Sequence, residues 1–189
     1  MKPKSFEEKT VDTKRIYDGK ILNLRVDKVL LPNGRESTRE VIEHGGAACI
    51  LPVGMDGTVY LVRQFRYPFN REVLEAPAGK LEPGEIVSDA ANRELEEETG
   101  FRAQELVYLG EFLPSVAYLT EIIHLYLARG LTEEKQHLDE DEFLNIESYP
   151  FDRVVEMIAR GDISDGKTIA AVFKAKLYLE NEEKEVTGR

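Results

Sequence analysis

The pattern of apolar and polar positions divides the 189 residues into an early strand-rich part and a longer mixed part. Over residues 11–43, short apolar runs predict strands, and Pro32-Asn33-Gly34 predicts the turn of a hairpin whose returning strand spans 35–43. Gly45-Gly46 then interrupts the pattern. We therefore predict a small antiparallel β subdomain over residues 1–45, followed by a second domain over residues 46–189.

The second part alternates strand-like and helix-like segments. Apolar runs predict strands at 47–53, 58–65, 106–112 and 122–128, and the first two are expected to be central strands separated by a turn. An acidic loop is expected at 138–145. Because strands and helices alternate irregularly, we predict an α/β fold with a mixed sheet between helices.

Two helices are predicted near the C-terminus. Residues 151–160 form the first, and residues 165–180 form the second, with Ser164 or Asp165 as its N-cap. The charged end at 182–189 is expected to fray. The core face expected for the second helix comprises Ile169, Val172, Phe173 and Leu177.

A further helix, predicted after Pro83-Gly84, ends in a crowd of acids. Gly100 is well placed as the left-handed residue that stops it. Between Leu81 and Phe101 the chain has seven carboxylates and one basic residue, Arg93. The apolar stripe of this helix comprises Val87, Ala90, Ala91 and Leu95, and its last turn holds Glu94, Glu96, Glu97 and Glu98.

This arrangement of acids predicts a metal site. Carboxylates are disfavoured at a helix C-terminus, and Glu94 and Glu98 repel each other at a spacing of four residues. A divalent cation would relieve both costs, and ligands that are all oxygen favour Mg²⁺ or Mn²⁺. The alternative is a solvated helix face, but such faces normally alternate their charges, and here only Arg93 is available.

Composition narrows the function further. A net charge of −11 argues against binding a nucleic-acid duplex, which requires clustered basic residues. The single cysteine, Cys49, lies in an apolar run and is interpreted as a small buried residue in a protein of the reducing cytoplasm. No apolar run approaches the length needed to cross a membrane, and we expect a soluble cytoplasmic protein.

The same residues carry a resemblance to a known family. Gly79, Glu85 and the run Arg93-Glu94-Leu95-Glu96-Glu97-Glu98-Thr99-Gly100-Phe101 match every fixed position of the Nudix box. The chain therefore resembles a Nudix hydrolase. This resemblance implies an α/β/α sandwich whose loop-helix-loop motif binds divalent metals and cleaves a diphosphate linked to another moiety.

The resemblance implies a role for each matched residue. Glu94 and Glu98 would be metal ligands, and Glu97 would be a ligand or a partner that holds water. The carbonyl of Ala78 would complete the metal sphere. Glu85 would pair with Arg93, which orients the carboxylates as groups around a metal commonly do.

The acidic stretch Asp139-Glu140-Asp141-Glu142 is similar to the catalytic loop of one branch of this family. By this similarity Glu140 would position or deprotonate the attacking water, and Glu142 would add a metal ligand. The alternative is an exposed, solvated acidic loop.

That branch is the ADP-ribose pyrophosphatases, which the chain resembles over most of its length. The resemblance implies a Mg²⁺-dependent enzyme, with Mn²⁺ as a substitute, that hydrolyses ADP-ribose to AMP and ribose 5-phosphate. Arg39 and Arg66 would bind phosphate or the adenosine side, and Glu121 a ribose hydroxyl. The matching stretches are the N-terminal β subdomain, Arg39-Glu40, Gln64-Phe65-Arg66 and Glu75-Ala76-Pro77-Ala78-Gly79.

Other functions stay open at this point. The branch usually has a Ser-Pro-Gly stretch shortly before the glutamate matching Glu121, whereas here Pro114 falls two positions early and Ala117 replaces the glycine. The substrate could therefore be another nucleoside diphosphate derivative, such as a GDP-sugar or a dinucleoside polyphosphate. A Nudix-fold module that binds a nucleotide without cleaving it is a further alternative, although it would be expected to lose glutamates of the box, which this chain keeps.

The N-terminal strands also predict a partner. They resemble the subdomain through which this branch forms dimers, often by exchange, and they cannot easily bury both faces alone. We expect a homodimer with an active site lined by both chains, acting on a nucleotide-sugar substrate and binding neither nucleic acid nor membrane.

Overall fold

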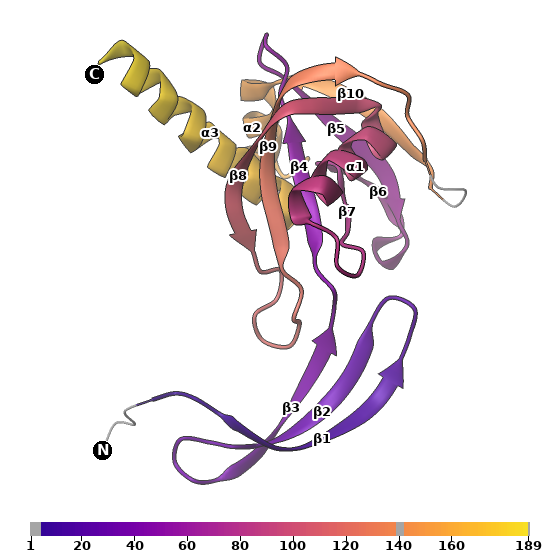
Figure 1. Ribbon diagram of the computed structural model, residues 1–189, viewed down its shortest axis with the longest axis vertical. Coiled ribbons are helices and arrows are strands. Elements are labelled where there is room, and N and C mark those ends of the chain that lie inside the picture. Colours follow the sequence, from indigo (N-terminus) through magenta and orange to yellow (C-terminus); the bar gives the residue numbers. More distant parts are fainter. Residues whose placement is uncertain (1–4, 139–141, 189) are drawn as a thin grey trace. The chain divides into compact units, whose positions relative to one another are not determined.

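The computed structural model describes residues 5–138 and 142–188 (Figure 1). The chain divides into two compact units. The first comprises Met1–Gly46 with Leu113–Glu121, and the second comprises Ala47–Phe112 with Ile122–Arg189. Each unit has its own sheets, and each is described by itself below.

The first unit is built on a three-stranded antiparallel sheet in the order β1-β2-β3. The predicted hairpin is present, because β2 (Asn23–Leu30) pairs with β3 (Glu36–Glu43) across a turn in which Gly34 has a φ of 81°. Every residue of β1 (Lys9–Asp18) is exposed. The segment from Leu113 joins this unit by an Ile42 N–H bond to the Tyr118 carbonyl, at 2.7 Å.

The second unit contains two sheets. A four-stranded mixed sheet has the order β7-β4-β9-β8, in which β4 and β9 are parallel and the other neighbours antiparallel. A three-stranded antiparallel sheet has the order β10-β5-β6. The strands are β4 (Ala47–Pro52), β5 (Thr58–Arg66), β6 (Arg71–Glu75), β7 (Ala78–Lys80), β8 (Phe101–Phe112), β9 (Ile123–Glu133) and β10 (Leu144–Pro150), and a 3₁₀ turn, Tyr67–Phe69, follows β5.

The predicted mixed sheet is confirmed, with additions that the sequence pattern did not show. The two apolar runs expected as central strands are β4 and β5, and each is central, but in different sheets. Strands β6, β7 and β10 were not predicted, and β10 begins at Leu144, inside the stretch expected to be loop. Of that acidic loop, residues 139–141 lie outside the described part of the chain.

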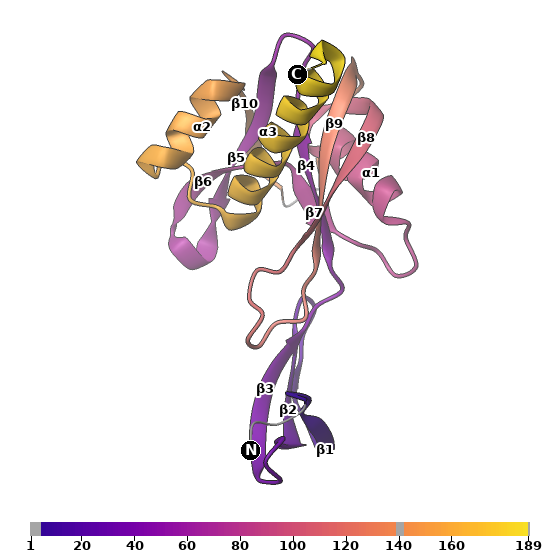
Figure 2. The same cartoon turned by 90° about the vertical axis from the view of Figure 1, so that its left-hand side faces the viewer.

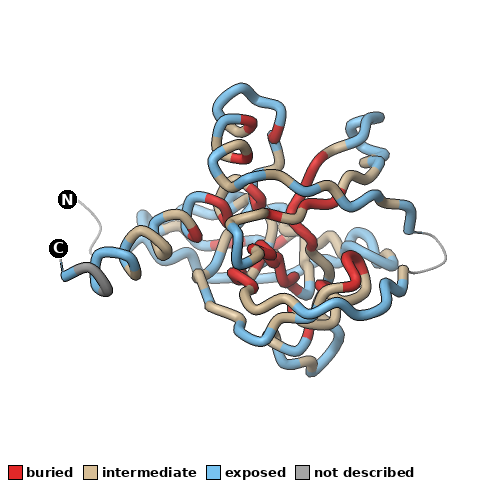
Figure 3. Tube along the Cα trace, turned by 90° about the horizontal axis from the view of Figure 1, so that it is seen from above, coloured by how far each residue is buried: buried red, intermediate tan, exposed pale blue. Residues whose placement is uncertain are grey.

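Helices cover both faces of the mixed sheet (Figure 2). On one face, α1 (Val87–Thr99) packs Ala90, Ala91 and Leu95 against Ala48 and Ile50 of β4. This is the predicted stripe, since a period of 3.6 residues places these three side chains on one side of the helix. The buried segments gather in the central strands and in the helix faces that cover them (Figure 3).

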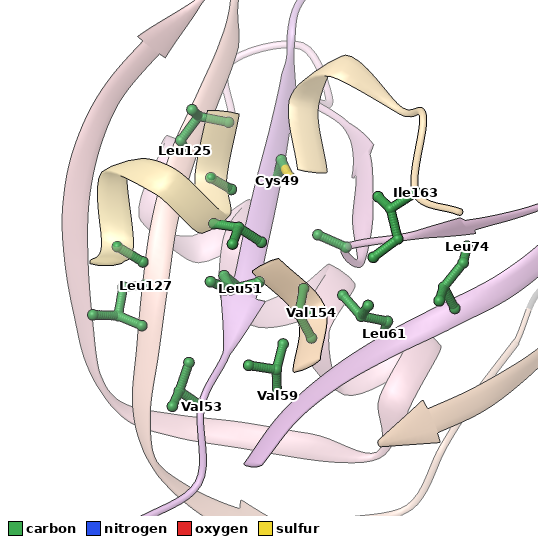
Figure 4. Packing of buried hydrophobic residues seen from close by; sticks show 14 of the residues in the cluster. Cys49, Leu51, Val53, Val59, Leu61, Leu74, Leu125, Leu127, Val154 and Ile163 are labelled. Atoms are coloured by element: carbon green, nitrogen blue, oxygen red, sulfur yellow. The ribbon is translucent and has the colours of Figure 1, made fainter. Parts of the chain in front are cut away.

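The opposite face carries the larger core (Figure 4). Helices α2 (Phe151–Arg160) and α3 (Gly166–Thr187) contribute Val154 and Val172 to the same cluster as Leu51, Leu125 and Leu127, and all five side chains are fully buried. Cys49 lies in this core, as predicted, and burial raises the pKa of its thiol to about 12. Neutral at ordinary pH, this thiol packs as an apolar group.

Helix α3 departs from its predicted form. Asp165 is its N-cap, as predicted, with a carboxylate that accepts the Thr168 N–H at 3.0 Å. The helix continues to Thr187 instead of fraying from residue 182. The expected core face is wrong at Phe173 and Leu177, which are 42% and 61% exposed, because the stripe that enters the core follows Ala171, Val172 and Ala175.

Candidate functional site

The acidic end of α1 lies beside β7, which explains how its carboxylates are held. The helix stops at Gly100, which has a φ of 66° and donates its N–H to the Glu96 carbonyl at 2.8 Å. The Ala78 N–H, at the start of β7, donates to Glu98 Oε2 at 3.1 Å. The next residue is Gly79, and a Cβ there would overlap the Glu94 carboxylate. The missing side chain therefore makes the space that Glu94 occupies.

Arg93 connects four groups around this end of the helix. Its Nε and Nη2 donate to the two oxygens of Glu85, at 2.8 and 3.0 Å. Its Nη1 donates to Glu94 Oε1 at 2.7 Å and to Glu97 Oε2 at 2.9 Å. Its Nη2 also donates to the Lys80 carbonyl at 3.2 Å, which attaches the group to the end of β7. A fork-shaped guanidinium suits this task, because it donates in several fixed directions at once.

The carboxylates near Arg93 differ in how well their charge is balanced. The hydrogen bonds from Arg93 hold the pKa of Glu85 at about 2. Burial raises the pKa of Glu98 to about 8, and the charges of Glu94 and Glu142 add to this shift. Burial also raises the pKa of Glu94, which the hydrogen bond from Arg93 only partly offsets. Two buried carboxyls thus lack sufficient positive charge, which is costly for groups of this kind.

The chemistry of this donor set fits a hard divalent cation. Glu98 and Glu94 are only 4% and 9% exposed, and they offer oxygen atoms alone, as Mg²⁺ and Mn²⁺ prefer. In residues 5–138 and 142–188, no three His, Cys, Asp or Glu side chains stand close enough together to hold a metal. The hydrogen bonds account for this, because Arg93 holds Glu94 and Glu97 while the Ala78 N–H holds Glu98.

A second charged group involves the end of β5. Arg66 donates from Nε and Nη2 to the two oxygens of Glu75, at 2.6 and 2.7 Å, and Lys167 of α3 donates to the same carboxylate. The charges of Arg66 and Lys167 both act on Glu98, which places this group next to the acidic end of α1. Within the described residues, Nη1 of Arg66 makes no hydrogen bond. This nitrogen can therefore donate to a phosphate oxygen while Glu75 fixes the rest of the guanidinium.

Comparison with known proteins decides the family. The family model of the NUDIX domain matches residues 43–172 of this chain. The chain belongs to the Nudix family. Members of this family typically use a divalent metal, in agreement with the chemistry of the buried carboxylates. A second family model, described as the nucleoside diphosphate sugar hydrolase N-terminal domain, matches residues 8–42.

Individual relatives are similar to this chain over most of its length. The chain is 42% identical to an ADP-ribose pyrophosphatase of Bacillus subtilis (strain 168) over 171 residues, which is 89% of this chain and 92% of that protein. It is equally similar, with the same coverage, to a methanol dehydrogenase activator of Bacillus methanolicus. A crystal structure of an ADP compounds hydrolase superposes with a TM-score of 0.84, over 95% of this chain and 98% of that one, at 24% identity. The predicted family and fold are therefore confirmed.

The structure brings most of the predicted Nudix box residues together. Glu85, Arg93, Glu94 and Glu97 form one hydrogen-bonded group, with Glu98 and Ala78 in contact beside it. Their individual roles stay predictions. Glu142 is exposed, and its charge raises the pKa of Glu94 and of Glu98, so it lies within electrostatic reach of both. Glu140 lies outside the described residues.

Two predicted substrate-binding residues belong to the first unit. Arg39 of β3 pairs there with Glu8, at 2.5 Å between Nη2 and Oε1. Glu121 lies 3.5 Å from Nδ1 of His44, measured from Oε1. That ring nitrogen accepts the Gly46 N–H at 3.1 Å, which fixes the orientation of the ring. Binding by Arg39 and Glu121 stays a prediction.

No role was predicted from the sequence for Glu75, Lys167 or Thr168. Glu75 was part of the stretch quoted for the resemblance, without a function of its own. Lys167 could have been noticed in the sequence, because a cation in the first turn of a helix is disfavoured by the helix dipole. Such a residue indicates a nearby acidic partner. The partners are Glu75 and Asp165, and the ammonium group of Lys167 is buried between these two acceptors.

None of the helices in the described part of the chain combines the length and apolar character needed to cross a membrane.

Proposed function

We propose that the protein is a Mg²⁺-dependent pyrophosphohydrolase, with Mn²⁺ as a substitute, that cleaves ADP-ribose to AMP and ribose 5-phosphate. The observation that carries the proposal is the pair Glu94 and Glu98, two buried carboxyls with raised pKa values at the end of α1. A divalent cation bound to a diphosphate supplies the positive charge that they lack. ADP-ribose is favoured as the substrate by the 42% identity to an ADP-ribose pyrophosphatase over 89% of the chain.

Each residue has a defined part in this proposal. Glu94 and Glu98 would hold the cation, together with Glu142 and the Ala78 carbonyl. When bound, the cation offsets the charge of the diphosphate and acidifies the attacking water. Arg93 orients Glu94 and Glu97 from one nitrogen, with Glu85 fixing the other side of its guanidinium.

The remaining steps concern water and phosphate. Glu140 accepts a proton from the attacking water, whose oxygen bonds to one phosphorus as the bridging P–O bond breaks. Glu97 holds water beside the carboxylates. Arg66 donates from Nη1 to a phosphate oxygen, which fixes the diphosphate relative to the metal ligands. Arg39 contributes to binding of phosphate or the adenosine side, and Glu121 to that of a ribose hydroxyl.

Product analysis tests the reaction directly. Incubated with ADP-ribose and Mg²⁺ in ¹⁸O-labelled water, the protein is expected to release AMP and ribose 5-phosphate in equal amounts. One ¹⁸O atom should enter one of the two products, and mass spectrometry then identifies the phosphorus attacked. Preferential turnover of a GDP-sugar or a dinucleoside polyphosphate would show that ADP-ribose is not the substrate. The proposed pyrophosphohydrolase reaction would still hold. A stable calorimetric isotherm for ADP-ribose without AMP would indicate a binding module instead.

A second candidate function follows from the Bacillus methanolicus relative. That protein is named a methanol dehydrogenase activator and matches this chain at the same 42% identity over 171 residues. The chain could therefore act on a dehydrogenase as well as on a nucleotide. Adding it to a purified methanol dehydrogenase tests this, and the hydrolytically impaired Glu98→Gln variant shows whether activation depends on hydrolysis.

We also propose that residues 1–45 serve dimerisation and residues 46–189 carry the catalytic domain. Support comes from β1, whose apolar side chains Val11, Ile16 and Tyr17 are 56%, 47% and 57% exposed. Apolar surface of this kind on a strand with no covered face is stabilised when a partner buries it.

Light scattering tests the dimer. At micromolar concentration the mass is expected to be twice the 21.5 kDa of one chain. The double variant Val11→Lys, Ile16→Lys should shift it toward the monomer, because charges replace the apolar side chains. Met55→Lys is the matched control, since Met55 is fully exposed in the turn between β4 and β5. If the wild-type protein has the mass of a single chain, the proposed dimer is wrong.

A further inference from the structure

We propose that Thr168, in the first turn of α3, is a positioning residue for the metal site. Its hydroxyl fixes the short segment that begins at Ala76. That segment places the Ala78 N–H where it can donate to the Glu98 carboxylate. This inference rests on the proposed metal-dependent hydrolysis and concerns a residue 70 positions from Glu98 in the sequence. Thr168 touches neither the substrate nor the cation in this proposal and acts only through the backbone.

The hydroxyl of Thr168 makes two hydrogen bonds in a fully buried position. It accepts the Ala76 N–H at 2.8 Å and donates to Asp165 Oδ2 at 2.6 Å. A hydroxyl can do both at once, whereas a valine of the same shape can do neither. The Ala76 N–H is itself buried, so Thr168 is its partner in place of water.

Ala76 begins the short connection that leads from β6 to the metal site. Pro77 follows, and its carbonyl accepts the Ile50 N–H at 2.9 Å. Ala78 comes next and donates its N–H to Glu98 Oε2 at 3.1 Å. The connection is thus held from β4 on one side and from α3 on the other, and its third residue sets where the Glu98 carboxylate lies.

The first turn of α3 is itself held firmly. Asp165 Oδ2 accepts the Thr168 N–H at 3.0 Å and the Lys167 ammonium at 2.9 Å in addition to the Thr168 hydroxyl. Lys167 also donates to Glu75, the last residue of β6. Two neighbouring residues of α3 therefore hold two neighbouring residues of the chain, Glu75 and Ala76. The bonds to a charged carboxylate are the stronger kind of hydrogen bond, which makes the turn a rigid support.

The experiment compares Thr168→Val with Thr168→Ser and with a matched control. Thr132→Val removes a threonine hydroxyl from an exposed position of β9, where it donates to the Arg102 carbonyl at 3.3 Å. Binding of Mn²⁺ to the substrate-free proteins is measured by electron paramagnetic resonance, at a temperature where circular dichroism shows every variant folded. Turnover of ADP-ribose with Mg²⁺ is measured alongside.

Thr168→Val is expected to weaken Mn²⁺ binding by about 10- to 100-fold, the usual loss when a group that orients a metal ligand is removed. Its kcat should fall while its KM for ADP-ribose changes little. Thr168→Ser, which keeps the hydroxyl, should restore Mn²⁺ binding to within about threefold, and Thr132→Val should match the wild type. Hydrogen exchange at the Ala76 and Ala78 amides should accelerate in Thr168→Val alone.

Two results would overturn the inference. Wild-type affinity for Mn²⁺ in a folded Thr168→Val variant would show that the hydroxyl does not position the site, while leaving the metal-dependent function in place. Equal losses in Thr168→Ser and Thr168→Val would show that packing, and not the hydroxyl, matters. Failure of the wild type to bind Mn²⁺ at all would instead remove the proposed function, and this inference with it.

Discussion

Replacing Glu98 by glutamine is expected to lower kcat for ADP-ribose by about a thousandfold or more while the fold stays intact. The substitution keeps the size of the side chain and its ability to accept the Ala78 N–H, but it removes the negative charge that holds a cation. Since groups that merely orient a metal ligand contribute about 10- to 100-fold, loss of a ligand itself should exceed that range. Steady-state kinetics with Mg²⁺ measures the effect.

The same variant should be more stable than the wild type when no metal is bound. Burial raises the pKa of Glu98 from 4.5 to about 8, so the folded protein binds this proton more tightly than the unfolded chain does. Protonated Glu98 therefore contributes stability to the fold. This contribution is fully present below pH 4.5 and is lost as the pH rises through about 8. The loss is on the order of 3–5 kcal/mol for a shift of this size.

Chemical denaturation in a chelator, at pH 5 and at pH 8, measures this difference. The free energy of unfolding of the wild type should fall between the two values relative to that of Glu98→Gln, which has no group to titrate at this position. Adding Mg²⁺ at pH 8 should stabilise the wild type and leave the variant nearly unchanged, because only the wild type offers a full set of ligands.

Glu96→Gln is the matched control for both measurements. Glu96 lies in the same turn of α1 but points to Arg102, 3.4 Å away, and takes no part in the acidic group. Its substitution should alter neither kcat nor the pH dependence of stability appreciably. Near-normal turnover in Glu98→Gln would show that Glu98 is not a metal ligand and that the site has been assigned to the wrong residues.

The local parts of this fold were predictable because their signals lie within single segments. The stripe of α1 and its stop at Gly100 follow from helical periodicity and from the left-handed backbone that glycine readily adopts. Strand β7 could not be predicted in this way, since its three residues, Ala78–Lys80, are too few to show a pattern. Nor could periodicity show that β4 and β5 enter different sheets, because pairing depends on contacts between distant segments.

In the candidate site, too, residues from one stretch of the sequence could be predicted, whereas residues from distant segments could not. Glu85, Arg93 and the glutamates of α1 lie within one stretch, so their spacing and charge identified them before the structure did. The group around Glu75 joins β5, β6 and α3, and Lys167 is separated from Glu75 by 92 positions. Glu75 is not unusual in its own segment, and Lys167 is unusual only as a cation in the first turn of a helix. The role of Glu75 and Lys167 depends on their being buried side by side, which only the folded chain shows.

Gly79→Ala is expected to reduce kcat/KM by about a hundredfold with little loss of stability. A Cβ at this position would overlap the Glu94 carboxylate, which is the mobile end of its side chain. The carboxylate can swing aside without disturbing the backbone of β7, so the fold survives, but a ligand displaced by about 1 Å is enough to cost two orders of magnitude. Affinity for Mn²⁺ should fall in parallel with activity.

Gly45→Ala provides the control, because a Cβ there meets nothing within 4 Å and its backbone does not require glycine. It should keep wild-type kinetics and wild-type affinity for Mn²⁺. Gly79→Ala and Glu98→Gln both disturb the same acidic group, one by moving a ligand and the other by neutralising one. Their effects should therefore combine less than additively in the double variant, since a site that has lost one ligand has less to lose from the other. Independent, fully additive losses would mean that Glu94 and Glu98 do not serve one cation.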